Sequence, residues 1–289
     1  VQYWSALAAR DTRLMTHVLG RHFPAVLRNA SYATYIRCHD DIGWAITEAD
    51  AEAVGVTGPG HRAFLSDFYE GRFTGSFAEG ALFGVNPETG DKRISGTCAS
   101  LAGLERALAA GDRTSIDRAI DRILMGHALI AGFGGIPLIY MGDEIAMLND
   151  HSYIDDPDKQ HDSRWIHRPH MDWLTVERVR RGDESSPAAR VFHGLRHILD
   201  RRRKTPELHA SNPVRILTPP EPAVFTMVHD APTGQLLCAY NFTDYWTAVP
   251  GEWALMAGVR DMHDALSDRP VRLSDGNVAL PPYGRVWLR

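Results

Sequence analysis

The order of hydrophobic and polar positions divides the chain into two zones. Residues 1 to about 205 show mostly the three-to-four-residue spacing of amphipathic helices. From about residue 212 short apolar runs alternate with turn residues, which predicts a small antiparallel β domain. The expected helices are 1–20, 47–54, 60–70, 97–110, 114–132 and 186–203. The expected strands of the β domain are VRIL (214–217), AVFTMVH (223–229), QLLCAYNF (235–242), WTAV (246–249), VRL (271–273), NVAL (277–280) and RVWLR (285–289).

The first zone contains two strand-like segments, each followed at once by acidic residues. YATYIR (32–37) precedes HDD (39–41), and IPLIYM (136–141) precedes GDE (142–144). Each segment is followed, after a connection, by a helix, which is the order of β-loop-α units in a parallel sheet. Polar residues at the carboxyl ends of parallel strands form the active site of a (β/α)8 barrel.

A whole barrel needs eight strands and about 250 residues, and the first zone has two convincing strands. We therefore expect an α/β fold in which residues 1–209 form the C-terminal part of an incomplete (β/α)8 TIM barrel. Residues 210–289 are expected to form a C-terminal antiparallel β domain. The chain begins inside a helical pattern, without an initiating Met or an N-cap. We expect it to be a fragment of a longer protein, the alternative being a helix that starts at the terminus.

Composition narrows the function classes. The 289 residues include 23% charged and 44% hydrophobic residues with a formal net charge of -5, which is typical of a globular protein and favours neither nucleic acid nor membrane as a partner. Cys38, Cys98 and Cys238 are widely spaced and lack a metal-type pairing, so neither a disulfide framework nor a zinc site is expected. We expect a cytoplasmic location, with secretion left open. No apolar run approaches the roughly 18 residues of a membrane span.

Five co-linear segments carry a family resemblance. They are YIRCHDDIGW (35–44), FYEGRFTGSFAEG (68–80), KRISGTCASLAGL (92–104), GGIPLIYMGDEIAMLND (134–150) and KQHDSRWIHRP (159–169). Together they resemble amylosucrase and sucrose hydrolase, of the α-amylase superfamily (glycoside hydrolase family 13). The resemblance implies a retaining glucosyl enzyme that uses sucrose or another α-glucoside, with an α-glucan acceptor and no cofactor. It also implies a long loop insertion at about 45–95, over the mouth of the active site.

The resemblance assigns roles to five residues. His39 and Asp40 would contact the glucosyl ring, with Asp40 stabilising the oxocarbenium-like transition state. Asp41 and Arg93 would contact the acceptor or the leaving fructosyl group, and Arg164 would close the pocket by pairing with an acid upstream of this chain. A fixed carboxylate beside the ring gains strength as positive charge develops there, which suits a supporting role for Asp40.

The resemblance also predicts what the chain lacks. In the family the nucleophile and the acid/base follow the fourth and fifth strands, which would precede residue 1. The missing N-terminal part of the same protein is therefore the expected partner, and the chain alone is expected to be inactive. Gly84 stands where a longer polar side chain is expected in amylosucrases, so transfer and hydrolysis both stay open.

Each feature also has a structural interpretation. HDD is compatible with a helix-capping turn, whose acids accept free N–H groups. Asp143 and Glu144 of GDE are compatible with acids at a strand end that cap the next helix or pair with a nearby Arg. Four histidines gather loosely in the sequence without a ligand spacing, so no metal is expected; they are His151, His161, His167 and His170. The rival functions are a trehalose synthase or isomaltulose synthase type of enzyme, and a non-catalytic carbohydrate-binding or structural fragment.

Overall fold

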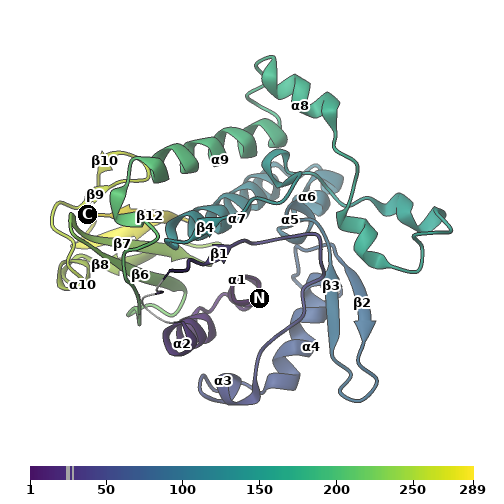
Figure 1. The fold of residues 1–289 in the computed structure, drawn as a ribbon, viewed down its shortest axis with the longest axis horizontal. Helices are drawn as coiled ribbons and strands as arrows, with labels where there is room; N and C mark the ends of the chain where they lie inside the picture. Colours follow the sequence, from purple (N-terminus) through teal and green to yellow (C-terminus); the bar gives the residue numbers. More distant parts are fainter. Residues whose placement is uncertain (24–26, 28) are drawn as a thin grey trace. The chain divides into compact units, whose positions relative to one another are not determined.

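The computed structural model describes residues 1–23, 27 and 29–289. Their contacts divide the chain into two compact units, each built from segments that are separate in the sequence. The first unit comprises Val1, Ile36–Leu124 and Ile139–Gly194, and the second comprises Gln2–Tyr35, Met125–Leu138 and Leu195–Arg289. Two long helices, α7 (Arg113–Gly132) and α9 (Pro187–Arg203), contribute residues to both units (Figure 1). The domain boundary at residue 209 stays a prediction.

The second unit contains the predicted antiparallel β structure. Six strands pair in the order β10-β9-β12-β7-β6-β5, and β8 pairs with β11 in a separate ladder. The strands are β5 (Val214–Leu217), β6 (Val224–Ala231), β7 (Gly234–Asn241), β8 (Thr247–Pro250), β9 (His263–Asp264), β10 (Arg269–Pro270), β11 (Asn277–Leu280) and β12 (Arg285–Leu288). Apolar side chains from both ladders form one buried core; they include Val224, Val228, Leu237, Ala239, Val249, Val278, Leu280 and Leu288.

The β domain differs from the expectation in several details, among them the short strands β9 and β10, which were not predicted. VRL (271–273) is not a strand, because pairing with β9 is confined to β10 and ends at Pro270. Val271 instead donates its N–H to the carbonyl of Met262, at 2.7 Å. A short helix, α10 (Gly251–Met256), follows β8 and was not predicted.

The opening of the chain forms two helices where one was predicted. The helix α1 (Gln2–Ala9) is separated from α2 (Arg13–His22) by Arg10, whose φ of +54° ends the first helix. The carboxylate of Asp11 accepts the N–H of Arg13 at 2.9 Å, and the hydroxyl of Thr12 donates to the carbonyl of Val224 at 3.0 Å. Such side-chain bonds compete with the helical ladder, and helical periodicity does not reveal them.

The two predicted strands of the first zone pair in parallel but are shorter than expected. The strand β1 (Ala33–Thr34) pairs with β4 (Ile136–Pro137). The N–H of Ile136 donates to the carbonyl of Tyr32 at 2.7 Å, and the N–H of Leu138 donates to that of Thr34 at 2.8 Å. Pro137 has no N–H to add to the ladder. The parallel pairing agrees with neighbouring β-loop-α units, and the incomplete barrel itself stays a prediction.

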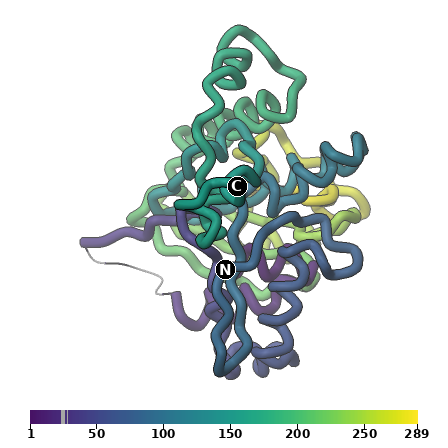
Figure 2. Tube along the Cα trace, turned by 90° about the vertical axis from the view of Figure 1, so that its right-hand side faces the viewer, coloured from purple at the N-terminus to yellow at the C-terminus, as the bar shows by residue number. Residues whose placement is uncertain are grey.

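The first unit is mainly helical and carries one hairpin that was not predicted. Its helices are α3 (Glu48–Glu52), α4 (Gly58–Tyr69), α5 (Cys98–Leu101), α6 (Leu104–Ala110) and α8 (Trp173–Arg180). The strands β2 (Ala81–Val85) and β3 (Lys92–Ser95) pair antiparallel, and Figure 2 shows the two arms of this hairpin side by side. The segment 45–95 therefore folds as helices followed by a hairpin.

The predicted helix 97–110 is broken into α5 and α6. Gly103 lies between them with a φ of +93°, which a residue with a side chain rarely adopts. A Cβ at this position would lie 3.0 Å from the carbonyl oxygen of Phe77. The N-terminus of α5 is capped by Thr97, whose hydroxyl accepts the N–H of Ser100 at 3.2 Å.

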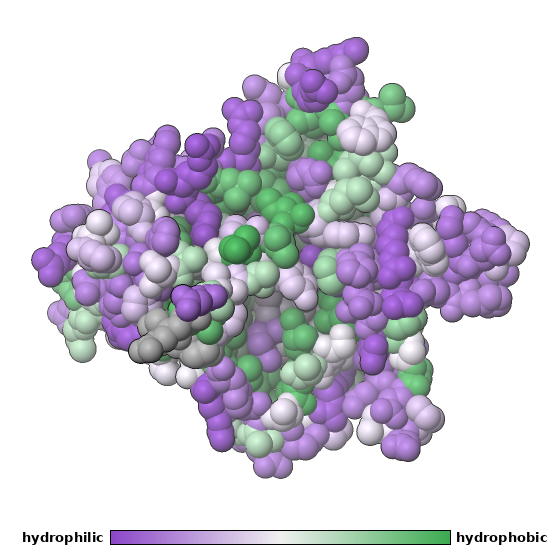
Figure 3. Space-filling model, in the orientation of Figure 1, coloured by the Kyte–Doolittle hydropathy of each residue, from purple (hydrophilic) through white to green (hydrophobic). Residues whose placement is uncertain are grey.

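Short 3-10 turns connect the later part of the first unit. They are η1 (Asp143–Ile145), η2 (His151–Asp155) and η3 (Ser163–His167), and a further one, η4 (Pro206–Leu208), belongs to the second unit. The surface over the segment from η2 to η3 is largely hydrophilic (Figure 3). Among the described residues, no helix combines the length and apolar character needed to cross a membrane.

Candidate active site

The HDD turn lies beside the end of β3. Ile42, the residue after the turn, forms an antiparallel bridge with Ile94 of β3, with N···O distances of 2.7 and 3.1 Å between the two residues. This bridge fixes the turn against the hairpin. As a result, Asp41 comes within reach of Arg93 on the same strand.

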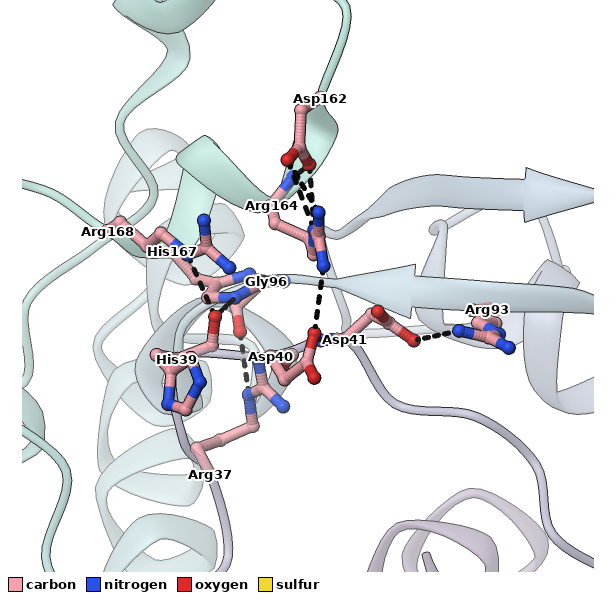
Figure 4. A network of polar contacts seen from close by, with 10 residues as sticks. All are labelled: Arg37, His39, Asp40, Asp41, Arg93, Gly96, Asp162, Arg164, His167 and Arg168. Atoms are coloured by element: carbon pink, nitrogen blue, oxygen red, sulfur yellow. Dashed lines mark hydrogen bonds and ion pairs between the residues drawn. The ribbon is translucent and has the colours of Figure 1, made fainter. Parts of the chain in front are cut away.

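Three side chains from two segments hold the backbone of the turn (Figure 4). Arg37 Nη2 donates to the carbonyl of Asp40 at 2.8 Å. The carbonyl of His39 lies 3.0 Å from His167 Nε2 and accepts from Arg168 Nε at 2.8 Å. The turn is thus positioned by side-chain hydrogen bonds in addition to the backbone bridge between Ile42 and Ile94.

Arg164 joins the turn to η3. Its guanidinium contacts both carboxylate oxygens of Asp162, with Nε at 2.9 Å from Oδ1 and Nη2 at 2.8 Å from Oδ2. Its Nη1 atom lies 3.3 Å from Oδ1 of Asp40, and its Cζ atom lies 4.5 Å from the centre of the Phe83 ring on β2. These two carboxylates raise the pKa of Arg164, which is charged at any ordinary pH in any case.

The two carboxylates of the turn differ in environment. The side chain of Asp41 is only 6% exposed, and its Oδ2 lies 3.5 Å from Nη1 of the more exposed Arg93. Burial, together with the adjoining Asp40, raises the pKa of Asp41 above its ordinary value. Burial alone would raise the pKa of Asp40 as well, but the N–H of Asp41 and the guanidinium of Arg164 outweigh it and lower that pKa. Neighbouring acids with pKa values shifted in opposite directions are typical of functional sites.

An open hollow of about 760 Å³ adjoins Asp41. Arg93 and Arg62 line it together with Gly84, and Arg62 is held by Asp91 at 2.8 Å. The other lining residues are Gly43, Trp44, Ala45, Phe83, Val85, Asn86, Pro87, Glu88, Asp91 and Lys92. The hollow is therefore lined by both basic and acidic side chains, with Asp41 and Arg93 among them.

Gly84 lies at a β-bulge of β2, where the register shifts between Phe83 and Val85. Its φ is +59°, and a Cβ built there would meet no atom within 4 Å. Space therefore allows a longer side chain at this rim, and the left-handed backbone is what favours glycine. The expectation about transfer and hydrolysis stays open.

The five predicted site residues all lie in the first unit. The structure brings Asp40 together with Arg164 and Asp41 together with Arg93, and the side chain of His39 is exposed. Their predicted roles stay predictions. The pairing of Arg164 with an upstream acid stays a prediction; within the chain its carboxylate partners include Asp162 and Asp40.

Sequence reasoning missed the residues that hold the turn. Arg37 was not singled out, although a basic residue inside an apolar strand-like segment was a signal that it binds polar groups internally. His167 was seen only as a member of a loose histidine group. Its ring is buried, and nothing in the local sequence reveals that burial.

The GDE segment makes a local contact. Glu144 Oε2 accepts the N–H of Gly142 at 2.8 Å, within the turn that begins η1. This bond is what the capping interpretation of the acid implies.

Metal ligation was considered for the histidines. Of the four, only His151 belongs to a group of three potential ligand side chains whose ligand atoms lie within 4.8 Å of one another, in the part of the chain that the structure describes. Its companions are Glu79 and Glu105, and His151 Nε2 lies 2.6 Å from Glu105 Oε1. This distance is that of a hydrogen bond.

The β domain is similar to a known family. Residues 214–289 match the family model of the amylosucrase C-terminal domain. The match covers the six-stranded sheet and the β8–β11 ladder of the second unit.

Similar solved structures include AmyP in complex with maltose, at 15% identity and a TM-score of 0.46, with 59% of this chain and 34% of that chain covered. A variant of AmyP in complex with maltotriose gives 15% identity and a TM-score of 0.47 over 59% of this chain and 35% of that chain. The type III pullulan hydrolase from Thermococcus kodakarensis gives 18% identity and a TM-score of 0.40, over 60% of this chain and 24% of that chain. The chain thus spans about a third or less of the length of these proteins.

Proposed function

We propose that the chain is the C-terminal part of an amylosucrase-like retaining enzyme of the α-amylase superfamily. The enzyme would act on sucrose, transferring the glucosyl unit to an α-glucan or to water. The nucleophile and the acid/base would come from an N-terminal part of the same protein. The chain would supply the supporting half of the active site, with no cofactor.

The observation that carries this proposal is the pairing of two adjacent carboxylates with arginines from different segments, beside an open hollow. Arg164 contacts Asp40 and Arg93 contacts Asp41. The lowered pKa of Asp40 keeps this carboxylate charged, as stabilisation of a cationic sugar ring requires. The hollow at Asp41 and Arg93 offers room for the acceptor or the leaving fructosyl group.

Two independent features support the same family. The five co-linear sequence segments lie between residues 35 and 169, whereas the matching family model covers residues 214–289. The resemblance and the match therefore rest on different parts of the chain. Both point to amylosucrase-like proteins.

The test is sucrose turnover by a protein that joins this chain to an N-terminal barrel part carrying the missing carboxylates. We expect release of fructose together with glucose or insoluble α-glucan, and the 289-residue chain alone is the matched control, expected to release none above background. Formation of trehalose or isomaltulose would favour the rival enzyme types. Absence of any glucosyl chemistry in the joined protein would leave the non-catalytic interpretation.

A further inference from the structure

Two backbone carbonyls of the HDD turn are held by buried side chains on opposite sides. The carbonyl of Asp40 accepts from Nη2 of Arg37, at 2.8 Å, and the carbonyl of His39 lies 3.0 Å from Nε2 of His167. Arg37 is 3% exposed and His167 is fully buried. The two donors are therefore buried and fixed by the packing around them, whereas His39 and Asp40, which they hold, are exposed.

The two holding side chains meet at Gly96. The N–H of Gly96 donates to Nδ1 of His167 at 3.1 Å, and its carbonyl accepts from Nε of Arg37 at 2.9 Å. A ring of contacts thus runs from Gly96 through both side chains to the turn and closes along the backbone of Asp40, between the carbonyls of His39 and Asp40 (Figure 4). Gly96 lies in the two-residue connection between β3 and α5, next to the capping residue Thr97, so the anchor is held between two regular elements.

These contacts define the tautomer of His167. Because Nδ1 accepts the N–H of Gly96, it carries no proton, and Nε2–H is then the donor to the carbonyl of His39. Burial, assisted by the positive charge of Arg37, lowers the pKa of His167 to about 3. The ring is accordingly a neutral bridge with one acceptor and one donor.

Arg37 complements this bridge from the other side. Its guanidinium donates through two different nitrogens to two carbonyls, those of Gly96 and Asp40. A planar fork does this in one orientation, whereas the ammonium group of a lysine is a single point of donation. The orientation of the Asp40 backbone, and with it the direction of the carboxylate toward Arg164, is set by this fork.

We propose that His167 and Arg37 are positioning residues of the sugar site, which align Asp40 by tying the carbonyls of His39 and Asp40, on either side of the Asp40 Cα atom, to Gly96. This inference rests on the proposed function, because it is Asp40 beside the sugar ring that makes the alignment matter. Neither residue touches the substrate in this proposal. Their effect on turnover passes through Asp40.

The first experiment measures the position of the turn without sugar. In the 289-residue chain, the carboxyl ¹³C resonance of Asp40 is titrated in wild type, His167→Gln, His167→Asn and the exposed control His170→Asn. The amide of Gln reaches the Nε2 position and can still donate to the carbonyl of His39, whereas Asn retains only the acceptor for Gly96. We expect the Asp40 pKa to rise toward its ordinary value in His167→Asn and to stay near the wild-type value in His167→Gln and in the control.

A companion measurement uses the wild-type chain and therefore does not require that any variant folds. Long-range ¹H–¹⁵N spectra of the wild-type chain at pH 7 should show His167 as the neutral Nε2–H tautomer. A cationic ring or the Nδ1–H tautomer would overturn the proposal, and so would an Asp40 titration unchanged in a folded His167→Asn chain.

The second experiment measures sucrose turnover in the joined protein of the proposed function. We expect His167→Asn and Arg37→Lys to lower kcat by at least about tenfold with KM changed less than threefold, and His167→Gln to recover much of the loss. A loss in KM alone would contradict alignment of Asp40. If the Asp40 titration gives the expected result but the wild-type joined protein turns over no glucoside, the positioning of Asp40 by His167 and Arg37 is retained and the proposed function is wrong.

Discussion

The Nη1 atom of Arg164 lies 3.3 Å from the Oδ1 atom of Asp40, 124 positions away in the chain. The same guanidinium is held in a two-point contact by Asp162 and stacks over Phe83. The orientation of the Arg164 side chain is therefore fixed by contacts other than the one with Asp40. A fixed cation beside Asp40 keeps that carboxylate charged and limits its movement.

Replacement of Arg164 tests this relationship. In the joined protein that we propose, Arg164→Ala is expected to lower kcat/KM on sucrose by at least about tenfold, because Asp40 and any upstream acid lose their common partner. Arg164→Lys should recover little, since an ammonium cannot reproduce the planar fork. Wild-type kcat/KM in Arg164→Ala would remove the reason for preferring a closed pocket for sucrose over a cleft for longer α-glucans.

Asp40→Asn tests the role of the charge itself. The substitution roughly conserves shape and removes the negative charge, so we expect kcat on sucrose to fall by at least about tenfold with the fold retained. Circular dichroism and the unfolding midpoint verify the fold. An unchanged kcat would exclude Asp40 from the stabilisation of the transition state.

Periodicity predicted the elements whose pattern is local. The helices α7 and α9 follow from apolar spacing, and the strands β6 and β7 follow from continuous apolar runs, which are buried on both faces over most of their length. Helix ends and breaks were missed where a distant group decides them. The break before α2 depends on hydrogen bonds from Thr12 to the carbonyls of residues 222 and 224, more than 200 positions away.

The site shows the same division. HDD and DSRW were visible as polar segments, and their resemblance to a family suggested a shared site. The hydrogen bonds from Arg37 and His167 to the turn could not be predicted from the sequence, because the burial of these two residues results from packing and leaves no periodic signal. The β2–β3 hairpin was missed because its strands are short and its turn interrupts the apolar pattern.

The buried histidines predict a loss of stability in acid. The pKa of His167 is lowered to about 3, and burial lowers that of His229 to about 4. Both values lie below the ordinary 6.5, so the unfolded chain binds more protons between these limits, and the free energy of unfolding must fall as pH falls below about 6.5. His229 Nδ1 is buried without a hydrogen-bond partner in the described structure, so protonation there would add an unsatisfied donor.

Urea titrations at pH 7.5 and pH 5 measure this effect. Each histidine should contribute about 2 kcal/mol to the difference between the two free energies of unfolding, from roughly 1.4 kcal/mol per pH unit. His167→Gln should reduce the difference by that amount, and His170→Gln, at an exposed site, should leave it unchanged. An identical difference in wild type and His167→Gln would show that His167 titrates normally in the folded chain.

The position of Gly103, between α5 and α6, is expected not to tolerate a side chain. Gly103→Ala should lower the free energy of unfolding by about 2 kcal/mol, because the left-handed backbone and the nearby carbonyl of Phe77 both oppose a Cβ. The matched control is Gly111→Ala, where φ is +65° and a Cβ meets nothing within 4 Å. A loss in Gly111→Ala equal to that in Gly103→Ala would mean that the backbone conformation alone matters.

The contacts of Asp264 indicate that this acid of the β domain stabilises the fold, and we expect it to have no catalytic role. Its buried carboxylate accepts three backbone N–H groups, from Leu266 at 3.0 Å, Ser267 at 3.0 Å and Trp287 at 2.8 Å. Asp264→Ala leaves these donors without that acceptor, so the free energy of unfolding should fall by about 3 kcal/mol.

The exposed acid Asp244, paired with Arg10 at 3.1 Å, is the matched control for Asp264, and Asp244→Ala should cost less than about 1 kcal/mol. The Asp264→Ala variant of the joined protein is then assayed at a low temperature at which it remains folded. We expect the wild-type kcat on sucrose, because the carboxylate supports the sheet and touches no substrate. Loss of kcat in a variant of unchanged stability would instead assign a catalytic role to the β domain.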